Sequence, residues 1–281
     1  MGRGVMGSAQ LNIAICLDEN YLDPARTLLE SLRAHHGAHR LVIWMLHDGL
    51  SQGSIDAVAA QCAGWASVRS VPVDFDLAPY FGAGDDWLPY QNKSVLFRIL
   101  LPEQLRAHGI RRILYLDCDI ICVGSLEPLV SADLQGATVG AVSDAFTPRL
   151  SSGGGIPGHV VTRDAEYFNS GVLLIDVEAW HERKTEQRCL EYLRSVRGAQ
   201  RFYDQDALNV ACEGQWHRLS DRFNTMITDP FEGDLGSALR TARLLHFVGP
   251  HKPWHDDYFP GNRRTAYELY RHAWRTREVQ G

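Results

Sequence analysis

The sequence predicts an α/β protein built on a single, mainly parallel sheet that helices flank. Three short runs, at residues 11–17, 40–46 and 66–73, have the apolar or alternating pattern of strands, and helical apolar spacing follows the first two. Strands that alternate with helices in this way are typical of parallel sheets. The chain has 281 residues, and at roughly 150 residues per domain this length indicates one or two domains.

Polar residues mark where the first elements end and begin. The run 11–17 stops at Asp18, as expected of a buried strand that leads into a loop. Asp23 before Pro24 predicts the N-cap and the first residue of a helix. Ser51 predicts the N-cap of a second helix, in which apolar residues recur every three or four positions.

The later elements follow the same two periodicities. A loop is expected at residues 74–90, and the run 111–117 is the clearest buried strand in the chain. The Gly-rich stretch 151–158 is predicted to be a mobile loop inside the domain. Further strands are predicted at 137–143 and 168–175, and helices at 92–106, 178–196, 204–211 and 262–275.

Composition excludes several classes of protein. Apolar residues make up 45% and charged residues 22% of the chain, as in ordinary globular domains. The 28 Lys and Arg against 34 Asp and Glu give a net charge of −6, which argues against a nucleic-acid partner. No signal-peptide pattern, long apolar run or C-x-x-C pair occurs. We therefore expect a soluble, cytoplasmic protein without disulfides.

Two patterns that suggest ligand sites are set aside. Residues 153–158 match G-x-G-x-x-G, but Pro157 removes an N–H donor and no predicted helix follows, so a dinucleotide site is not expected. His246, His251 and His255 lie close in sequence, yet prolines make their segment irregular. A zinc site made of histidines alone is therefore not expected, whereas one of them beside carboxylates is.

Asp-x-Asp occurs at residues 74–76, 117–119 and 204–206, and the middle copy has the most suggestive context. Asp117 and Asp119 follow a buried strand, and ligands of α/β sheets bind outside the carboxyl ends of strands. Two adjacent carboxylates repel each other unless a cation neutralises them, and hard divalent ions prefer such oxygen ligands. The alternative is that Asp117 caps a turn and Asp119 faces solvent.

Four separated motifs carry a family resemblance. In order, they are ILYLDCDIICVGSLEPL with Arg98 in the helix before it, YFNSGVLLID, YDQDALN and LLHFVGPHKPWH. With these motifs, residues 11–255 resemble glycosyltransferase family 8 and are similar to its bacterial lipooligosaccharide galactosyltransferases. The resemblance implies a GT-A fold, a UDP-hexose donor, Mn²⁺ with Mg²⁺ as the alternative ion, and retention of the anomeric configuration.

The resemblance also implies roles for individual residues. Asp117, Asp119 and His246 match the metal ligands. Asp18 and Asn20 match the uridine-binding loop, Arg98 a basic residue near the donor, and Gly249 and Lys252 the segment that closes over the diphosphate. Asp144, Asn169, Asp204 and Gln205 match residues that hydrogen-bond the transferred sugar. The residue after Asn169 is Ser170, a small departure from the family pattern.

Retention requires either a double displacement or attack on the same face that the leaving group departs from. Gln205 is matched to the place of the nucleophile, and an amide is a poor nucleophile. We therefore predict front-face, SNi-like transfer in which Gln205 stabilises the cationic face of the sugar. Asp204 and Asp206 flank Gln205, and a carboxylate nucleophile stays open as the alternative.

Other functions fit parts of the same pattern. A nucleotidyltransferase also uses carboxylates and a divalent ion, and a non-catalytic UDP-sugar-binding protein or a self-glucosylating, glycogenin-like enzyme would keep several motifs. The donor sugar is expected to be glucose or galactose, and the acceptor a glycan, a glycolipid or a small molecule. The loops 81–91 and 248–255 are expected to close over the donor and to exclude water.

The last residues differ from the rest of the chain in charge. Residues 261–281 hold five Arg and two Glu, a balance of +3, so residues 1–260 sum to −9. We assign 1–260 to the catalytic domain and 261–281 to a basic, aromatic helix. That helix either packs on the domain or makes a weak peripheral contact with the inner face of an anionic membrane.

Overall fold

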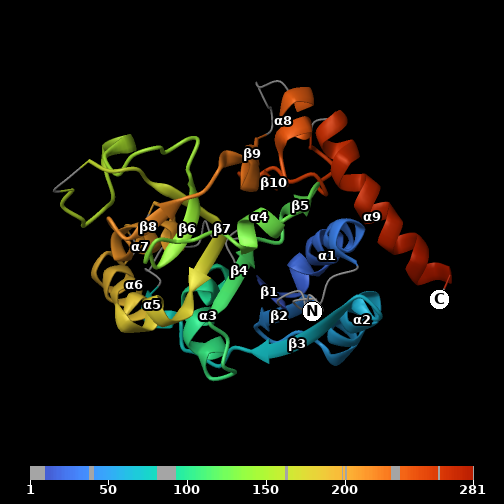
Figure 1. The fold of residues 1–281 in the computed structure, drawn as a ribbon, viewed down its shortest axis with the longest axis horizontal. Coiled ribbons are helices and arrows are strands. Elements are labelled where there is room, and N and C mark those ends of the chain that lie inside the picture. The colour runs from blue at the N-terminus through green and yellow to red at the C-terminus, as the bar shows by residue number, and fades with distance from the viewer. Residues whose placement is uncertain are drawn as a thin grey trace, which may run out of the picture.

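A seven-stranded sheet runs through the middle of the molecule (Figure 1). The computed structural model describes residues 10–37, 41–80, 93–161, 164–197, 199, 201–228, 235–258 and 260–280. The β3-β2, β2-β1, β1-β4 and β6-β8 pairs are parallel, and the two pairs that β7 makes are antiparallel. The sheet is therefore mixed and mainly parallel, as predicted. Across it, the strands are β3 (Ala66–Pro72), β2 (Leu41–His47), β1 (Leu11–Leu17), β4 (Arg112–Leu116), β7 (Phe168–Asp176), β6 (Val139–Ser143) and β8 (Trp216–Arg218).

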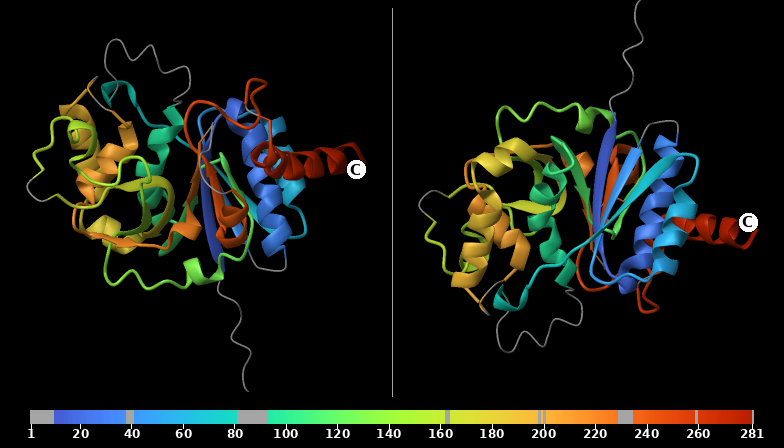
Figure 2. Two further views of the ribbon diagram at one scale, coloured as in Figure 1. Left: turned by 90° about the horizontal axis from the view of Figure 1, so that it is seen from above. Right: turned by 90° about the horizontal axis from the view of Figure 1, so that it is seen from below.

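Helices cover both faces of this sheet (Figure 2). Side chains alternate between the faces along a strand, so Ala14 and Cys16 of β1 join one apolar core, while Ile13, Ile15 and Leu17 join the other. The first core contains residues of α3 (Phe97–Arg106), α5 (Val177–Glu182), α6 (Thr185–Ser195) and α7 (Tyr203–Ala211). The second contains residues of α1 (Leu22–His36), α2 (Gln52–Cys62) and the short α4 (Glu127–Val130).

A second, three-stranded sheet lies beside the carboxyl end of β4. Its central strand, β10, pairs antiparallel with β5 and parallel with β9. None of these strands is longer than four residues, and none was predicted, because so short a run carries no readable periodicity. The strands are β5 (Ile120–Cys122), β10 (Leu244–Phe247) and β9 (Thr225–Ile227), and α8 (Leu235–Thr241) precedes β10.

Two predicted details of the helices are wrong. Asp23 is not an N-cap, because α1 already begins at Leu22, and Asp18 instead caps a preceding 3₁₀ turn, Glu19–Tyr21. The predicted helix 178–196 is two helices, α5 and α6, separated at Lys184, whose φ of 53° is incompatible with a continuous right-handed helix. Ser51 does cap α2, where its hydroxyl accepts a hydrogen bond from the N–H of Ser54.

Two other predicted segments contain short 3₁₀ turns. Residue 92 is not described, and the predicted helix 92–106 appears as a 3₁₀ turn, Lys93–Leu96, that leads into α3. The Gly-rich stretch contains a 3₁₀ turn at Ser152–Gly154, and no helix begins between it and Val161. The G-x-G-x-x-G pattern therefore lacks the helix N-terminus that a dinucleotide site needs.

The basic tail forms α9 (Asn262–Gln280), which lies along α1 (Figure 1). Arg271 and Arg275 pair with Asp23 of α1 at 2.8 and 2.6 Å, and the indole of Trp274 donates to Thr27 at 3.1 Å. Arg263 and Arg264 donate to backbone carbonyls, and Arg277 pairs with Glu30. All five arginines of the tail thus have partners within the chain. The division at residue 260 and a membrane contact of this helix stay predictions.

None of the helices in the described part of the chain has a stretch that is both long and apolar enough to cross a bilayer.

Candidate active site

The predicted metal ligands meet where the two sheets adjoin. Asp117 follows the last residue of β4, and Asp119 precedes the first residue of β5. The register of the small sheet sets His246 opposite Ile120, so its imidazole lies beside Asp119. One ligand atom from each of Asp117, Asp119 and His246 lies within 4.8 Å of the other two.

The donor set of this cluster fits a divalent cation. His246 Nε2 lies 3.2 Å from Asp119 Oδ1 and 3.8 Å from Asp117 Oδ2. Asp119 Oδ1 is buried and accepts no hydrogen bond from the described residues, although a buried carboxylate oxygen normally has a partner. A cation bound by two carboxylates and one imidazole would provide that partner. The residues are therefore suited to a metal ion.

Gly171 of β7 leaves room for these ligands. The backbone N–H of Asp117 donates to its carbonyl at 2.9 Å, which brings the two chains into close contact. A Cβ atom at position 171 would lie 2.3 Å from His246 Cε1 and 2.9 Å from Asp117 Oδ2. Only glycine fits such a close approach.

Arg98 of α3 is buried and binds two acidic side chains of the site. Its guanidinium lies 2.8 Å from Asp117 Oδ1 and 3.2 Å from Asp204 Oδ2, and it donates to the carbonyl of Ser170 at 3.0 Å. Burial alone would lower the pKa of Arg98, but the two carboxylates raise it well above its ordinary value. Arg98 therefore holds carboxylates in place here, while its predicted contact with the donor stays a prediction.

Burial disfavours the ionised form of Asp204. Burial raises the pKa of Asp204 to about 6, an effect that Arg98 partly opposes and Asp117 reinforces. The hydroxyl of Ser170 donates to its Oδ2 at 2.9 Å. The carboxyl group is thus held in one orientation, close to β7.

Asp144, Asn169 and Gln205 form one hydrogen-bonded cluster. The amide nitrogens of Asn169 and Gln205 donate to Asp144 Oδ2 at 3.1 and 3.2 Å. The amide oxygen of Gln205 accepts from Asn169 Nδ2 and from the backbone N–H of Ser170. Asp144 Oδ1 accepts the N–H groups of Phe146 and Thr147. The structure thus brings together three of the four residues that were predicted to bind the sugar, and their role stays a prediction.

Lys252 binds Asp119, the second aspartate of the possible metal ligands. Its ammonium group is buried and donates to Asp119 Oδ2 at 2.6 Å and to the carbonyl of Phe247 at 2.7 Å. Burial would raise the pKa of Asp119, but the neighbouring Lys252, and after it His246, lower it well below its usual range. Asp119 is therefore ionised at neutral pH. Gly249, with φ of 90°, makes the turn between β10 and Lys252.

Asp18 and Asn20 lie at the carboxyl end of β1. β1 and β4 are parallel neighbours, with Ala14 opposite Tyr115, so the residues that follow β1 and those that follow β4 lie at the same edge of the sheet. Asp18 accepts hydrogen bonds from the backbone and the side-chain amide of Asn20. The predicted uridine-binding residues thus lie at the same sheet edge as Asp117, and their role stays a prediction.

Two residues of the site, Asn224 and Asn209, were missed at the sequence level, and Asp206 was considered there only as an alternative nucleophile. Asn224 accepts from His246, Asn209 binds α7 to β7 through the backbone of Phe168, and Asp206 accepts from Tyr167 and two backbone N–H groups. Single Asn and Asp residues carry no sequence signal for such contacts. Asp206 is also fully buried and fully bonded, which leaves it unsuited to be a nucleophile.

The other patterns in the sequence lie outside this cluster. Asp76 accepts the backbone N–H of Ala78 and so closes a local turn. His251 is exposed and lies 3.5 Å from Asp257. Among the described residues, neither joins a cluster of potential metal ligands.

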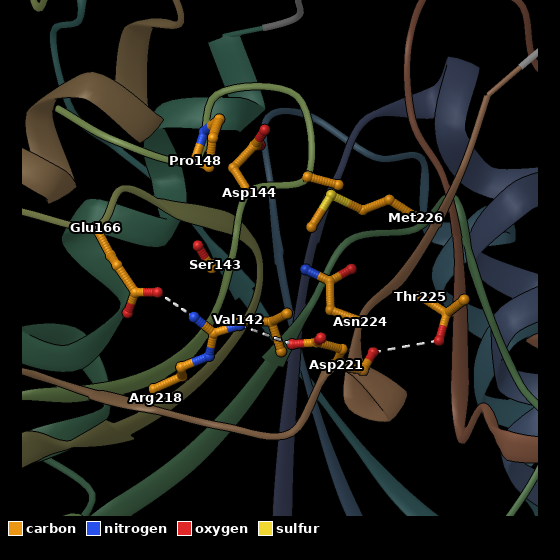
Figure 3. Close-up of a pocket in the computed structure, with 11 residues that line it drawn as sticks. Val142, Ser143, Asp144, Pro148, Glu166, Arg218, Asp221, Asn224, Thr225 and Met226 are labelled. Carbon is orange, nitrogen blue, oxygen red and sulfur yellow. Dashed lines mark hydrogen bonds and ion pairs between the residues drawn. The ribbon is translucent and has the colours of Figure 1, made fainter. Parts of the chain in front are cut away.

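A cavity of about 380 Å³ opens beside Asp144 (Figure 3). Arg218 lies across its floor and pairs with Glu166 and Asp221. Asn224 reaches its wall from the segment before β9. The cavity has the size of a small-molecule site, and Asp144 is the residue of the Asp144, Asn169 and Gln205 cluster that lines it.

Comparisons with known proteins agree with this geometry. The family described as "Glycosyl transferase family 8" matches residues 12–258. The chain is 25% identical over 274 residues to general stress protein A of Bacillus subtilis (strain 168), covering 89% of this chain and 92% of that protein. It is 26% identical over 253 residues to lipopolysaccharide 1,2-glucosyltransferase of Escherichia coli (strain K12), covering 87% of this chain and 73% of that protein.

A solved structure has the same fold. The galactosyltransferase LgtC, in complex with donor and acceptor sugar analogues, superimposes with a TM-score of 0.76 at 24% identity. The match covers 94% of this chain and 96% of that chain. It confirms the predicted GT-A architecture.

Proposed function

The chain belongs to glycosyltransferase family 8, and we propose that it transfers a hexose from a UDP-hexose to a saccharide or glycoconjugate acceptor with retention of configuration. The observation that carries this proposal is the contact of two clusters at one sheet edge. The possible metal ligands Asp117, Asp119 and His246 form one cluster, and Asp144, Asn169 and Gln205 form the other. Asn224 connects them, because it is hydrogen-bonded to both His246 and Asn169. The first set suits a diphosphate-bound cation, and the second suits sugar hydroxyls.

The donor would lie between these two clusters. A bound divalent ion, Mn²⁺ by preference, would neutralise the negative charge on the departing UDP. Lys252 is buried beside the same site, and it would bind a phosphate oxygen if it exchanged Asp119 for the diphosphate. Gly249 would allow the backbone to approach the donor closely. Asp18 and Asn20 would contact the uridine from the end of β1.

We propose that transfer proceeds on one face of the sugar. The bond between the anomeric carbon and the phosphate oxygen breaks, and its electron pair leaves with UDP. An acceptor hydroxyl forms the new bond from the same face, and its proton passes to the departing phosphate oxygen. The surroundings of the carboxylates support this mechanism, because Arg98 binds Asp204 and hydrogen bonds fully engage Asp206.

Gln205 would then stabilise positive charge on the sugar rather than form a covalent bond. Replacement of Gln205 by Ala is expected to lower kcat by less than about 100-fold, because a non-covalent contact contributes less than a nucleophile does. Single-turnover rates of the purified variant measure this. A glycosyl adduct on Asp204 detected by mass spectrometry would instead show a double displacement.

Two of the similar proteins differ in the sugar that their names give. One protein is a lipopolysaccharide 1,2-glucosyltransferase, and the other is a galactosyltransferase. We propose glucose or galactose for this chain and a glycan, glycolipid or small molecule as the acceptor. The cavity beside Asp144 is a suitable entrance for that acceptor, because Asp144 of the sugar-binding cluster lines it.

The decisive experiment measures UDP release. Purified protein is incubated with UDP-glucose, UDP-galactose or UDP-N-acetylglucosamine, each with Mn²⁺ or with EDTA, and Asp119→Asn is the inactive control. Metal-dependent UDP release from one of the hexose donors is the expected result. Pyrophosphate as the product would indicate nucleotidyl transfer, and a mass increase of the protein itself would indicate self-glycosylation.

A further inference from the structure

A chain of hydrogen bonds connects the sugar-binding cluster to the possible metal ligand His246. Asn169 Oδ1 accepts the backbone N–H of Gly171 at 3.0 Å and the side-chain amide of Asn224 at 2.8 Å. Asn224 Oδ1 in turn lies 2.9 Å from His246 Nδ1. Asn224 and His246 are buried, so water does not compete for these contacts.

The direction of every hydrogen bond in this chain is determined by its ends. A backbone N–H only donates, so the atom of Asn169 that faces Gly171 is its oxygen. The other end of that amide faces the Asp144 carboxylate, which only accepts, so that atom is the nitrogen. The oxygen of Asn169 therefore receives the nitrogen of Asn224, and the oxygen of Asn224 faces His246.

The same logic fixes the tautomer of His246. An amide oxygen only accepts, so His246 Nδ1 carries the proton. In the neutral imidazole, Nε2 then holds a lone pair, and it faces Asp117 and Asp119. A metal ligand needs that lone pair.

The opposite tautomer would close the site. A proton on Nε2 would be directed at Asp119 Oδ1, which lies 3.2 Å away and accepts no other hydrogen bond from the described residues. In the resulting hydrogen bond, His246 Nε2 would be the donor and Asp119 Oδ1 the acceptor, so neither atom would be free to bind a cation. A cation can bind only if that tautomer is disfavoured. Asn224 disfavours it, because its amide oxygen accepts the proton of the other ring nitrogen, Nδ1.

We propose that Asn224 is a positioning residue that keeps His246 in the metal-binding tautomer and couples it to the sugar-binding amide of Asn169. This inference rests on the proposed function, because it assumes that a cation occupies the cluster. The fold explains the placement: Asn224 directly precedes β9, and β9 pairs with β10 so that Met226 lies opposite His246.

The first test reads the tautomer in the metal-free wild-type protein. Long-range ¹H–¹⁵N spectra at about pH 8, above the ordinary pKa range of imidazole, distinguish the two ring nitrogens, and His246→Gln identifies the signal. We expect the proton on Nδ1 and a bare Nε2. A proton on Nε2 in the wild-type protein overturns the inference, whatever the variants do.

The second test measures Mn²⁺ affinity by calorimetry in the presence of UDP. Asn224→Leu removes both hydrogen bonds at similar volume and is expected to weaken Mn²⁺ binding about 10- to 100-fold. Asn224→Asp keeps an acceptor for His246 but loses the donor to Asn169, so it should bind Mn²⁺ more tightly than the Leu variant. Thr225→Val is the matched control, since Thr225 lines the same cavity and its hydroxyl donates to the carbonyl of Asp221, away from His246 and Asn169.

The outcomes separate this inference from the proposed function. A folded Asn224→Leu protein with wild-type Mn²⁺ affinity and an unchanged His246 spectrum overturns the role of Asn224 and leaves the glycosyltransferase proposal intact. A wild-type protein that binds no Mn²⁺ with UDP overturns the metal-dependent proposal. In that case, or if the Leu variant does not fold, the wild-type spectrum still decides the tautomer.

Discussion

At Gly171 the backbone of β7 passes so close to the possible metal ligands that a single methyl group decides whether they can coexist. The possible metal ligands are charged or polar, but the space between Asp117 and His246 depends on Gly171, which has no side chain. Contacts of 2.3 and 2.9 Å from a Cβ cannot be relieved by a side-chain rotation alone, because one partner is a ring packed beside Asn224.

Gly171→Ala is therefore expected to displace His246 and weaken Mn²⁺ binding by about 100-fold or more, beyond the usual effect of a change behind a ligand. Calorimetric titration with Mn²⁺ and UDP measures the loss. Gly53→Ala is the control, because Gly53 lies in α2, where the nearest atom to a Cβ is 3.9 Å away. Equal affinity of Gly171→Ala and the wild type would contradict the close approach.

The raised pKa of Asp204 predicts a pH dependence of stability. Its pKa of about 6 in the folded protein lies above the ordinary value of 3.8, so the folded state binds more protons than the unfolded state between these values. The free energy of unfolding should fall as the pH rises from 4 to 6, by up to about 3 kcal/mol from this group. The contribution is complete below pH 4 and lost above pH 6.

Urea unfolding of the wild type and of Asp204→Asn across this pH range measures the difference. The Asn variant should lack that part of the slope, whatever its overall stability. Asp56→Asn, which alters an exposed carboxylate of α2, serves as the control and should keep the wild-type slope. Parallel curves for wild type and Asp204→Asn would show that burial does not raise this pKa.

At the scale of elements, α9 gives the basic tail a structural role. Its arginines face Asp23 and Glu30 of α1, and Arg26 of α1 lies over the Trp274 ring at 3.9 Å. Individual exposed ion pairs contribute little to stability. The burial of Trp274 against α1 and of Tyr267 against Phe247 therefore holds this helix on the domain.

Trp274→Ala is expected to lower the free energy of unfolding by about 3–5 kcal/mol, the range for removal of a buried aromatic side chain. Chemical denaturation measures the change. Leu269→Ala is the matched control, because Leu269 lies on the same helix and is 66% exposed. A Trp274→Ala protein as stable as the control would mean that α9 is only loosely attached, and would favour a contact with a membrane instead.

The predicted elements that the structure confirms are those that carry their own pattern. The apolar runs of β1, β2 and β4 and the capped helix α2 are readable from neighbouring residues. The elements that were missed depend on partners far away in sequence. His246 lies in a four-residue strand that exists through its pairing with β5 and β9, and the break at Lys184 becomes visible only in its backbone angles.

At the scale of the whole molecule, the site joins parts that no local pattern connects. Motifs that resemble a known family placed the possible metal ligands at Asp117, Asp119 and His246, and these residues do meet. The same motifs gave no role to Asn224, because its contacts follow from the register of β9 against β10 and from the amide of Asn169. Supporting residues of this kind require the folded chain.

A ligand that bridges the two sheets should stabilise the whole fold. Asp117 follows β4 of the large sheet, whereas His246 belongs to β10 of the small one, so a cation bound to both would connect them. Binding to the folded state alone adds about 2.7 kcal/mol when the free ligand is 100 times its Kd. For a chain of this length, we expect Mn²⁺ with UDP to raise Tm by about 5–10 °C. Calorimetric scans with and without EDTA measure the shift in Tm. His246→Gln should abolish the shift, and the control His251→Gln, at an exposed histidine, should keep it. A full shift in His246→Gln would exclude His246 as a ligand.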